Sequence, residues 1–302
     1  MPLLGASGVL AMLRQPWPTD GSIMLQQRVI TAVVLLVVFS VTLWVSSPLP
    51  FLLLTVAMIG AAGWEWMRLN SLRADKGAMV FSAVMMLSCW LLSSFIQPDR
   101  TLAAVWWVAA AAWVLGCGMA LRAGVAGWAR LPEAGRWVLG WLLLCVAWLA
   151  LAQARVVGVN FLLSILCLVW VADIAAYFGG RAFGRRKLAP AISPGKSWEG
   201  VYSGAVGVMI LAVLWLIADQ RLPTDSKSLY SVIYQSRGAL VLVASVIALT
   251  ALSVMGDLFE SLIKRAAGAK DSSQLLPGHG GVLDRIDALL PVLPVAMALA
   301  SL

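Results

Sequence analysis

Acidic residues and glycines gather in the last third of the chain, at a spacing that suits phosphate chemistry. Asp257, Asp284 and Asp287 flank the turn sequence Pro277-Gly278-His279-Gly280-Gly281. Carboxylates beside apolar segments are costly unless they are paired or bind a cation. Mg²⁺ prefers oxygen ligands and typically takes one or two carboxylates plus substrate phosphates. We therefore expect these three aspartates to hold one or two Mg²⁺ ions, with Gly280 and Gly281 letting backbone N–H groups approach a phosphate.

Four cations belong to the same segment and can neutralise phosphate charge: Lys264, Arg265, Lys270 and Arg285. An ordinary loop, basic for membrane topology and Gly-rich for turns, is the alternative interpretation. Topology requires neither the three carboxylates nor the His-Gly-Gly turn, so the whole set favours a site. His279 is the only histidine of the chain. Two roles stay open for it, donation to a phosphate oxygen or bracing of the turn.

A second polar segment, residues 180–199, has the features of a nucleotide-binding loop. Ser193 and Ser197 offer hydroxyls and Lys196 offers a point charge. The segment leads into an apolar run whose helical N–H groups would favour an anion. These residues together suit a triphosphate.

Asp173 precedes this loop, near the end of an apolar run. One interpretation pairs it with a nearby cation such as Arg181. An acid inside a membrane segment is nevertheless a functional candidate by default, and we include Asp173 among the expected substrate-binding residues.

The elements that must position these residues are membrane helices. Of the 302 residues, 61% are hydrophobic and only 12% are charged, and the mean hydropathy is +0.90, whereas soluble domains are roughly one quarter charged. We expect an all-α integral membrane protein with about nine transmembrane helices and two polar cytoplasmic catalytic loops, at 180–199 and 257–286. The expected helices span residues 28–46, 49–66, 78–96, 102–121, 136–153, 158–179, 200–218, 238–256 and 287–302.

The basic residues indicate the orientation of these helices. If both polar loops face one side, 17 of the 22 Lys and Arg residues lie on that side and 5 on the other. The positive-inside rule then makes the loop side cytoplasmic. The net charge of +8 is thus explained by topology and by phosphate substrates, and we expect no nucleic-acid partner. The four cysteines lie in apolar runs and are expected to be small buried side chains.

The expected domain organisation is simple. Residues 1–23 are broken by charges and prolines and are expected to be a poorly ordered tail, with Met24 as the usual start. Residues 24–302 form one polytopic domain, divided into N-terminal helices (24–155) and a catalytic part (156–302).

The polar segments resemble the signature of a known family. The pattern Ser261-x-x-Lys264-Arg265-x₄-Lys270-Asp271 … Pro277-x-His279-Gly280-Gly281-x-x-Asp284-Arg285-x-Asp287 is similar to that of the phosphatidate cytidylyltransferases, the CDP-diacylglycerol synthases. The run Ser193-Pro194-Gly195-Lys196-Ser197-Trp198-Glu199-Gly200 resembles a second family motif. In that motif the family commonly has Lys at the position of Gly195 and Thr at the position of Ser197. Residues from about 25 to the C-terminus share the resemblance.

The resemblance implies transfer of the cytidylyl group of CTP to phosphatidic acid, giving CDP-diacylglycerol and pyrophosphate. It also implies a homodimer, and one chain with short loops suits a bacterial inner membrane. Within this reaction we expect Asp257 and Asp284 to bind the metal, with Asp287 assisting or orienting Arg285. The four cations would hold CTP or lipid phosphates, and Ser193, Lys196 and Ser197 would contact the nucleotide.

Two other functions are weighed against this one. A related CTP-dependent transferase could act on another lipid acceptor, and an ion-coupled transporter could use intramembrane acids to bind ions. The unbroken signature argues against the first. The clustering of the acids in one half of the chain, without paired repeats, argues against the second. Trp64-Glu65-Trp66 also resembles the family, and Glu65 is expected to be structural, pairing with Arg68 at i,i+3.

Overall fold

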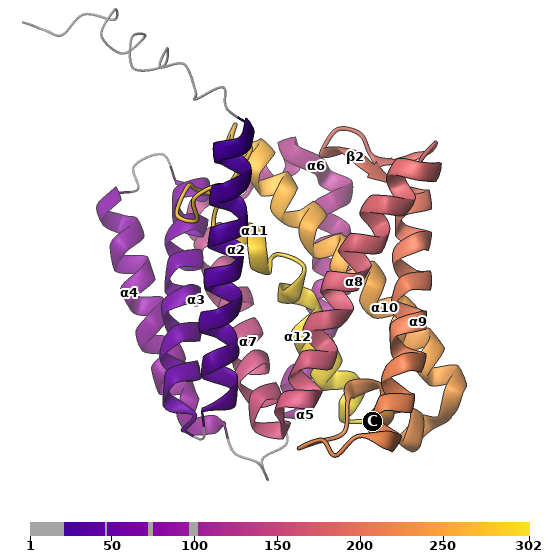
Figure 1. Ribbon diagram of the computed structural model, residues 1–302. Helices are drawn as coiled ribbons and strands as arrows, with labels where there is room; N and C mark the ends of the chain where they lie inside the picture. The colour runs from indigo at the N-terminus through magenta and orange to yellow at the C-terminus, as the bar shows by residue number, and fades with distance from the viewer. Residues whose placement is uncertain (1–20, 46, 72–74, 97–101) are drawn as a thin grey trace, which may run out of the picture.

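The computed structural model describes residues 21–45, 47–71, 75–96 and 102–302 as a bundle of long helices (Figure 1). The first half of the bundle comprises α2 (Gly21–Trp44), α3 (Leu49–Asn70), α4 (Asp75–Leu92), η1 (Ser93–Phe95), α5 (Ala103–Ala112), η2 (Trp113–Cys117), α6 (Gly118–Arg130) and α7 (Glu133–Val157). The second half comprises α8 (Val159–Phe183), β1 (Lys187–Ala189), β2 (Ser193–Ser197), α9 (Trp198–Arg221), α10 (Leu229–Ala266), α11 (Leu283–Ile286) and α12 (Leu289–Ala300).

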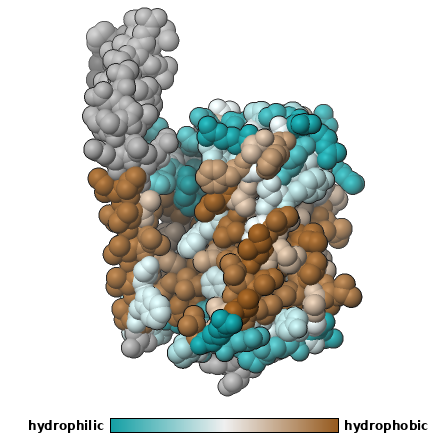
Figure 2. Space-filling model, turned by 45° about the vertical axis from the view of Figure 1, so that its right-hand side comes forward, coloured by the Kyte–Doolittle hydropathy of each residue, from teal (hydrophilic) through white to brown (hydrophobic). Residues whose placement is uncertain are grey.

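The chain is a multi-pass membrane protein. Within its described residues, seven helices are long and apolar enough to cross a bilayer. Figure 2 shows a hydrophobic band of side chains between two hydrophilic ends, which is the surface that a bilayer requires. Cys89, Cys117 and Cys145 are buried and Cys167 is partly buried, all as free thiols, as the sequence predicted.

The expected count of nine spans is not confirmed. Each predicted segment does contain a helix, but the described apolar part of α2, Val29–Trp44, is short. Helix α12 has only 12 residues, or about 18 Å at 1.5 Å per residue, which is less than the roughly 30 Å of a bilayer core. Its residues from Leu290 to Ala298 are all buried. The predicted last span is therefore a core helix enclosed by the bundle.

Helix α10 is longer than the sequence predicted and corrects the second polar loop. It runs for 38 residues, with non-helical backbone at Gly238 (φ 80°), where the predicted span began. Residues 257–266, expected in the loop, are its last turns. The loop proper starts after Ala266 and leads into the short helix α11. The acidic and basic residues of this stretch therefore have helical spacing.

The first polar loop also differs from the expectation of an all-α chain. Helix α8 continues to Phe183, and β1 and β2 form a small antiparallel hairpin in which Lys187 faces Ser197. Ser197 then caps α9 by accepting a hydrogen bond from the backbone N–H of Gly200, which is a preferred role for serine at a helix start. The hairpin and α11 lie toward the same end of the bundle (Figure 1).

Close packing joins the helices that flank the hairpin. A Cβ atom at Gly204 of α9 would lie 3.0 Å from the carbonyl oxygen of Ala172, and one at Gly207 would lie 2.7 Å from the Cβ of Ala175. Small residues of this kind let membrane helices approach closely. The α8–α9 pair therefore forms a firm base for the hairpin. Of the expected N-terminal tail, residues 1–20 lie outside the described residues and residues 21–23 begin α2.

Candidate active site

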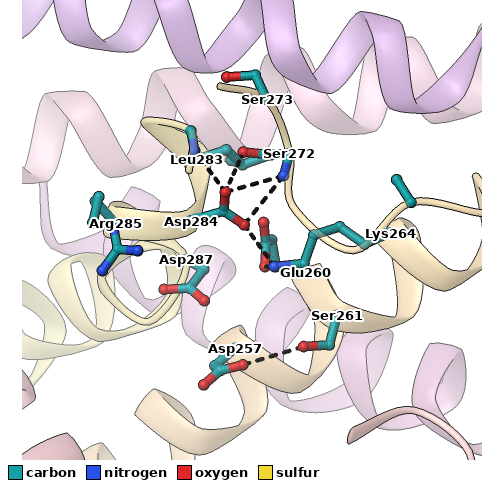
Figure 3. Close-up of polar contacts among 12 residues, drawn as sticks. Asp257, Glu260, Ser261, Lys264, Ser272, Ser273, Leu283, Asp284, Arg285 and Asp287 are labelled. Carbon is teal, nitrogen blue, oxygen red and sulfur yellow. Dashed lines mark hydrogen bonds and ion pairs between the residues drawn. The ribbon is translucent and has the colours of Figure 1, made fainter. Parts of the chain in front are cut away.

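The last turns of α10 carry four polar side chains on one stripe of the helix. Asp257 and Ser261 are one turn apart, as are Glu260 and Lys264, and residues at i and i+4 meet on a helix surface. The Ser261 hydroxyl donates to Asp257 Oδ1 at 3.3 Å, and Lys264 forms an ion pair with Glu260. Figure 3 shows Glu260 and Lys264 reaching toward Asp284 of α11, while Asp257 and Ser261 face each other one turn earlier. The extension of α10 beyond its predicted end thus builds one wall of the site.

The opposite face of these turns is anchored by aromatic rings. Phe259 lies edge-on to Trp128, with centroids 5.3 Å apart, and to Trp113 at 5.6 Å. All three side chains are buried. Edge-to-face pairs of this kind fix ring orientation as well as burying apolar area. The wall that carries Asp257 and Glu260 is therefore held from behind by α6 and η2.

The two polar segments meet at an ion pair. Lys196 Nζ of β2 lies 2.6 Å from Asp257 Oδ2, and the two side chains are 23% and 32% exposed. An ion pair that water and solutes can reach is able to exchange partners with a charged ligand. Residues that the sequence assigned to nucleotide contact and to metal binding are therefore brought together.

Asp287 lies beside this ion pair because of Gly256. A Cβ atom at Gly256 would stand 2.4 Å from the carbonyl oxygen of Asp287, so only glycine lets the α11–α12 junction cross α10 here. The side chain of Asp287 accepts from the N–H of Ala288 at 2.7 Å. Burial, and then the negative charge of Asp257, raise the pKa of Asp287 well above its ordinary value. Two carboxylates that repel in this way would be stabilised by a cation.

Asp173 completes the acidic group from α8. It interacts electrostatically with Asp257 and with Lys196. Its alternative partner, Arg181, instead donates from Nη1 to the Tyr177 hydroxyl at 3.4 Å. These charged neighbours, and the contact of Arg181 with Tyr177, favour the functional interpretation of Asp173 over the helix-end pairing.

Asp284 has a different environment from the other acids. Its carboxylate accepts hydrogen bonds from Lys264 Nζ (2.6 Å), the Gly281 N–H (2.7 Å), and the N–H (3.0 Å) and hydroxyl (2.8 Å) of Ser272. Burial alone would raise the pKa of Asp284, but contacts with Glu260, Lys264 and the Gly281 N–H bring it below its ordinary range. As placed, Asp284 organises the loop, and its oxygens face protein donors.

Glu65 of α3 enters the same loop from the N-terminal half of the chain. It accepts from the N–H groups of Val282 (2.9 Å) and Leu283 (2.6 Å) and from the hydroxyls of Ser272 and Ser273. The sequence suggested Arg68 as its partner, whereas Arg68 stacks on the Trp64 ring, 4.6 Å from its centroid. The predicted Glu65–Arg68 pairing is replaced by a set of contacts with the loop.

The remaining predicted residues are distributed around this cluster. The Arg285 guanidinium donates from Nε to the carbonyl oxygen of His279 at 3.0 Å and so fastens the turn, and His279 Nδ1 is buried without a hydrogen-bond partner. Arg265 donates to the carbonyl oxygens of Ile192 and Ala269, and Lys270 is exposed. Gly281 gives its N–H to Asp284.

Residues 278–281 form a tight turn that requires glycine. Gly278 and Gly280 have φ angles of 74° and 81°, a region that glycine adopts without strain. A Cβ atom at Gly280 would also lie 2.8 Å from Asp284 Oδ2. Ser193, by contrast, begins β2 and is partly buried. The predicted phosphate-binding residues therefore reach one end of the bundle on two kinds of structure, a glycine turn and a short strand.

Sequence reasoning missed Glu260, Ser272 and the role of Glu65. Glu260 is 1% exposed and shares Lys264 with Asp284. The i,i+4 spacing of Glu260 and Lys264 would have indicated their ion pair if the predicted helix had continued past residue 256. Ser272 and Glu65 gave no such signal, because their partners are defined by tertiary contacts.

The site has carboxylates that a divalent cation could use together with substrate oxygens. In the described part of the chain, no three acidic, His or Cys side chains form a ready-made metal cluster. Mg²⁺, however, typically uses one or two carboxylates plus substrate oxygens. Asp257 and Asp287, which interact electrostatically, are two carboxylates of the kind that such a site would use.

A multi-pass membrane protein with paired acids and bases at one end of its helices is a class that fits phosphoryl or nucleotidyl transfer to a lipid. Comparison with known proteins identifies the family. A family model described as the cytidylyltransferase family matches residues 26–302, and the chain belongs to this family.

Curated relatives agree with that assignment. The chain is 39% identical over 281 residues to the phosphatidate cytidylyltransferase of Pseudomonas aeruginosa, an alignment that covers 91% of this chain and 97% of that protein. It is 33% identical to the phosphatidate cytidylyltransferase of Haemophilus influenzae, with 90% and 96% covered. The protein of the same name from Thermotoga maritima is 43% identical over 134 residues, 44% of this chain and 46% of that protein. The resemblance seen in the sequence is confirmed.

Proposed function

We propose that this protein transfers the cytidylyl group of CTP to phosphatidic acid, releasing pyrophosphate and forming CDP-diacylglycerol. The observation that carries the proposal is the meeting of Lys196, Asp257 and Asp287 at the ends of membrane helices. Membership of the cytidylyltransferase family and the names of the relatives give the reaction class.

The chemistry requires charge control more than proton transfer. A phosphate oxygen of the lipid attacks the α-phosphorus of CTP, a new P–O bond forms, and the bond to the β-phosphate oxygen breaks. The attacking group is already an anion, so repulsion between phosphates is the main barrier. Preorganised cations that face the developing charge lower such a barrier strongly.

The residues of this chain divide that work. Lys196 exchanges its contact with Asp257 for a phosphate oxygen when the nucleotide enters. Ser193 lies on the same strand. Arg265 and Lys270, at the rim, attract the triphosphate. Asp257 and Asp287 would hold Mg²⁺, which when bound neutralises phosphate charge and orients the reacting oxygens. Asp284 and Lys264 keep α10 and α11 in register, and Asp173 bounds the site on the α8 side.

The proposal extends to the setting of the reaction. The bias of Lys and Arg toward the hairpin end supports a cytoplasmic active site in a bacterial inner membrane. The exposed apolar faces of the helices contact membrane lipids, a second copy of the chain forms a homodimer, and nucleic acid is not a partner.

The test is pyrophosphate release by purified protein in detergent, with CTP and Mg²⁺, in the presence and absence of phosphatidic acid. We expect release only when lipid and metal are both present, together with CDP-diacylglycerol as the lipid product. Folded protein that releases no pyrophosphate with phosphatidic acid, but does so with another phosphorylated lipid, would replace the acceptor and keep the reaction class.

A further inference from the structure

The carboxylate of Glu65 is completely buried, 0% exposed, and comes from α3, more than 200 residues from its partners. All of its hydrogen-bond contacts with the loop are made by uncharged groups. Oε1 faces the Ser273 hydroxyl and the Val282 N–H, and Oε2 faces the Leu283 N–H and the Ser272 hydroxyl. A buried charge is costly unless hydrogen bonds satisfy it, and here each oxygen has two donors in reach.

The contacts fix the beginning of α11. Val282 and Leu283 are the residues at which this helix starts, and their N–H groups have no partner within so short a helix. Glu65 accepts from both. Because these are backbone contacts, they hold the path of the chain rather than one side chain. The start of α11 is thereby tied to a membrane-spanning helix of the N-terminal half.

Ser272 couples this contact to the acidic cluster. Its hydroxyl lies 2.8 Å from Asp284 Oδ2 and 3.3 Å from Glu65 Oε2. One hydroxyl has one proton, so Asp284 and Glu65 share it, Asp284 at the shorter distance, and both carboxylates limit where Ser272 can move. Gly281 fits between them only because it has no side chain. A Cβ atom there would lie 2.0 Å from Ser272 Oγ and 2.4 Å from Glu65 Oε1.

The far end of α11 is the part that meets the nucleotide site. Asp287 follows α11 directly and passes over Gly256 next to Asp257. Helix α11 has only 4 residues. A displacement of Leu283 would therefore also displace Asp287. Figure 3 shows Asp284 next to Ser272 and Glu260, and Asp287 on the side toward Asp257.

We infer that Glu65 is a positioning residue: it holds the start of α11 so that Asp287 lies beside Asp257 and Asp284 contacts Lys264. It touches neither substrate in this role. The inference rests on the proposed function for the reaction that is measured. It makes α3, in the half of the chain outside the predicted catalytic part, a component of the active site.

The test compares Glu65→Gln with Asp219→Asn in the full-length protein in detergent. Both are acid-to-amide changes at a carboxylate held by uncharged donors, since Asp219 accepts from Ser228, Ser231 and Asn160 near the other end of the bundle. Outer-shell partners of metal ligands typically contribute 10- to 100-fold to activity or metal affinity. We expect Glu65→Gln to lower kcat by about that factor and to raise the Mg²⁺ concentration for half-maximal rate, with little change in KM for CTP.

Two further readouts separate positioning from general stability. Trypsin should cut after the exposed Lys270 faster in Glu65→Gln than in wild type, while Asp219→Asn keeps the wild-type cleavage rate and kcat despite a lower Tm. Glu65→Asp, which keeps the charge but is shorter, should recover part of kcat. If Glu65→Gln does not fold, Glu65→Asp and Ser273→Ala carry the test, and each should lower kcat with KM for CTP preserved.

Clear outcomes would overturn the inference. A Glu65→Gln protein with wild-type kcat and Mg²⁺ dependence, but a lower Tm, would make Glu65 an ordinary stabilising residue. A wild-type protein without transfer activity would refute the proposed function instead. In that case the Lys270 cleavage rate would still decide whether Glu65 holds the loop.

Discussion

Carboxylates gather at both ends of the helix bundle, but with different partners. At the end opposite the hairpin, Asp225 accepts from the N–H groups of Val159 (2.5 Å) and Asn160 (3.0 Å). Asp219 nearby accepts from the N–H of Ser228 at 2.9 Å. All of these donors are uncharged and belong to helix starts, where free N–H groups need partners. This end is a set of caps that ties α8, α9 and α10 together.

At the hairpin end, charges face charges. Asp257 faces Lys196 and Glu260 faces Lys264, and the Glu260 side chain is buried. Ion pairs can change partner when a phosphate or a metal enters, whereas a saturated cap cannot. Glu65 has the cap type of contact but lies at the end where the charges meet, and this combination is what identifies it as a positioning residue.

The largest effect should come from removing the charge of Asp257. Asp257→Asn leaves Lys196 without its anion and takes away one of the two adjacent carboxylates that would hold Mg²⁺. We expect kcat to fall by at least about 10²-fold, with Tm and elution volume close to wild type. The measurement is CDP-diacylglycerol formation from labelled CTP.

The contrasting variant at the other end is Asp219→Asn. Its effect should appear in Tm and leave turnover unchanged. If Asp257→Asn retains near-normal activity, or if both variants lose activity equally, the distinction between the two ends is wrong.

A smaller effect is expected from crowding the contact between Glu65 and the loop. Gly281→Ala forces the Cβ against Ser272 Oγ and Glu65 Oε1, and overpacking of this kind costs about 1–3 kcal/mol. We expect a lower Tm and about a tenfold lower kcat, because α11 must shift. Gly135→Ala in α7, where a Cβ meets nothing within 4 Å, is the matched control and should be neutral or slightly stabilising. Equal kcat values for the two variants would show that the loop tolerates displacement.

The smallest effect concerns Asp225 and depends on pH. Burial alone would raise the pKa of Asp225, but hydrogen bonds from the N–H groups of Asn160 and Val159 lower it below the ordinary value of 3.8. Its contribution to stability is therefore complete above about pH 4 and is lost as the pH falls through the lowered pKa. Asp225→Ala should lower stability by about 1 kcal/mol at neutral pH, as the loss of a helix cap does, without changing turnover. The Tm difference from wild type should shrink with acidification; a constant difference down to pH 3 would exclude the charge as its cause.

Much of the fold could be predicted from the sequence because the bilayer imposes long apolar segments. The cores of α3, α7, α8 and α9 fall within a few residues of the predicted spans. The errors occur where hydropathy stops being informative. Helix α10 continues through charged residues because Glu260 and Lys264 pair along it, and α12 is apolar because the bundle buries it.

The candidate site was predictable only in part, and for a related reason. Asp257, Lys196 and Asp287 stand in motifs dense with charge, so their residue types alone pointed to phosphate chemistry. The contacts of Glu65 depend on the path of residues 272–283 past α3, over a sequence separation of more than 200 residues. No local spacing encodes such a contact. The hairpin was missed because strands of three and five residues give too little periodicity.

The length of α10 after Gly238 has a consequence for how the lipid is reached. From residue 239 to Ala266 it extends about 42 Å at 1.5 Å per residue, against a hydrocarbon core of roughly 30 Å. With Gly238 at one face of the hydrocarbon core, the last turns of α10 would reach the phosphate groups of the lipids at the other face. Asp257 and Lys264 belong to this same helix. A lipid phosphate would then reach them by lateral diffusion within its own leaflet. The acyl chains can stay in the membrane throughout, and the soluble nucleotide is the partner that has to travel.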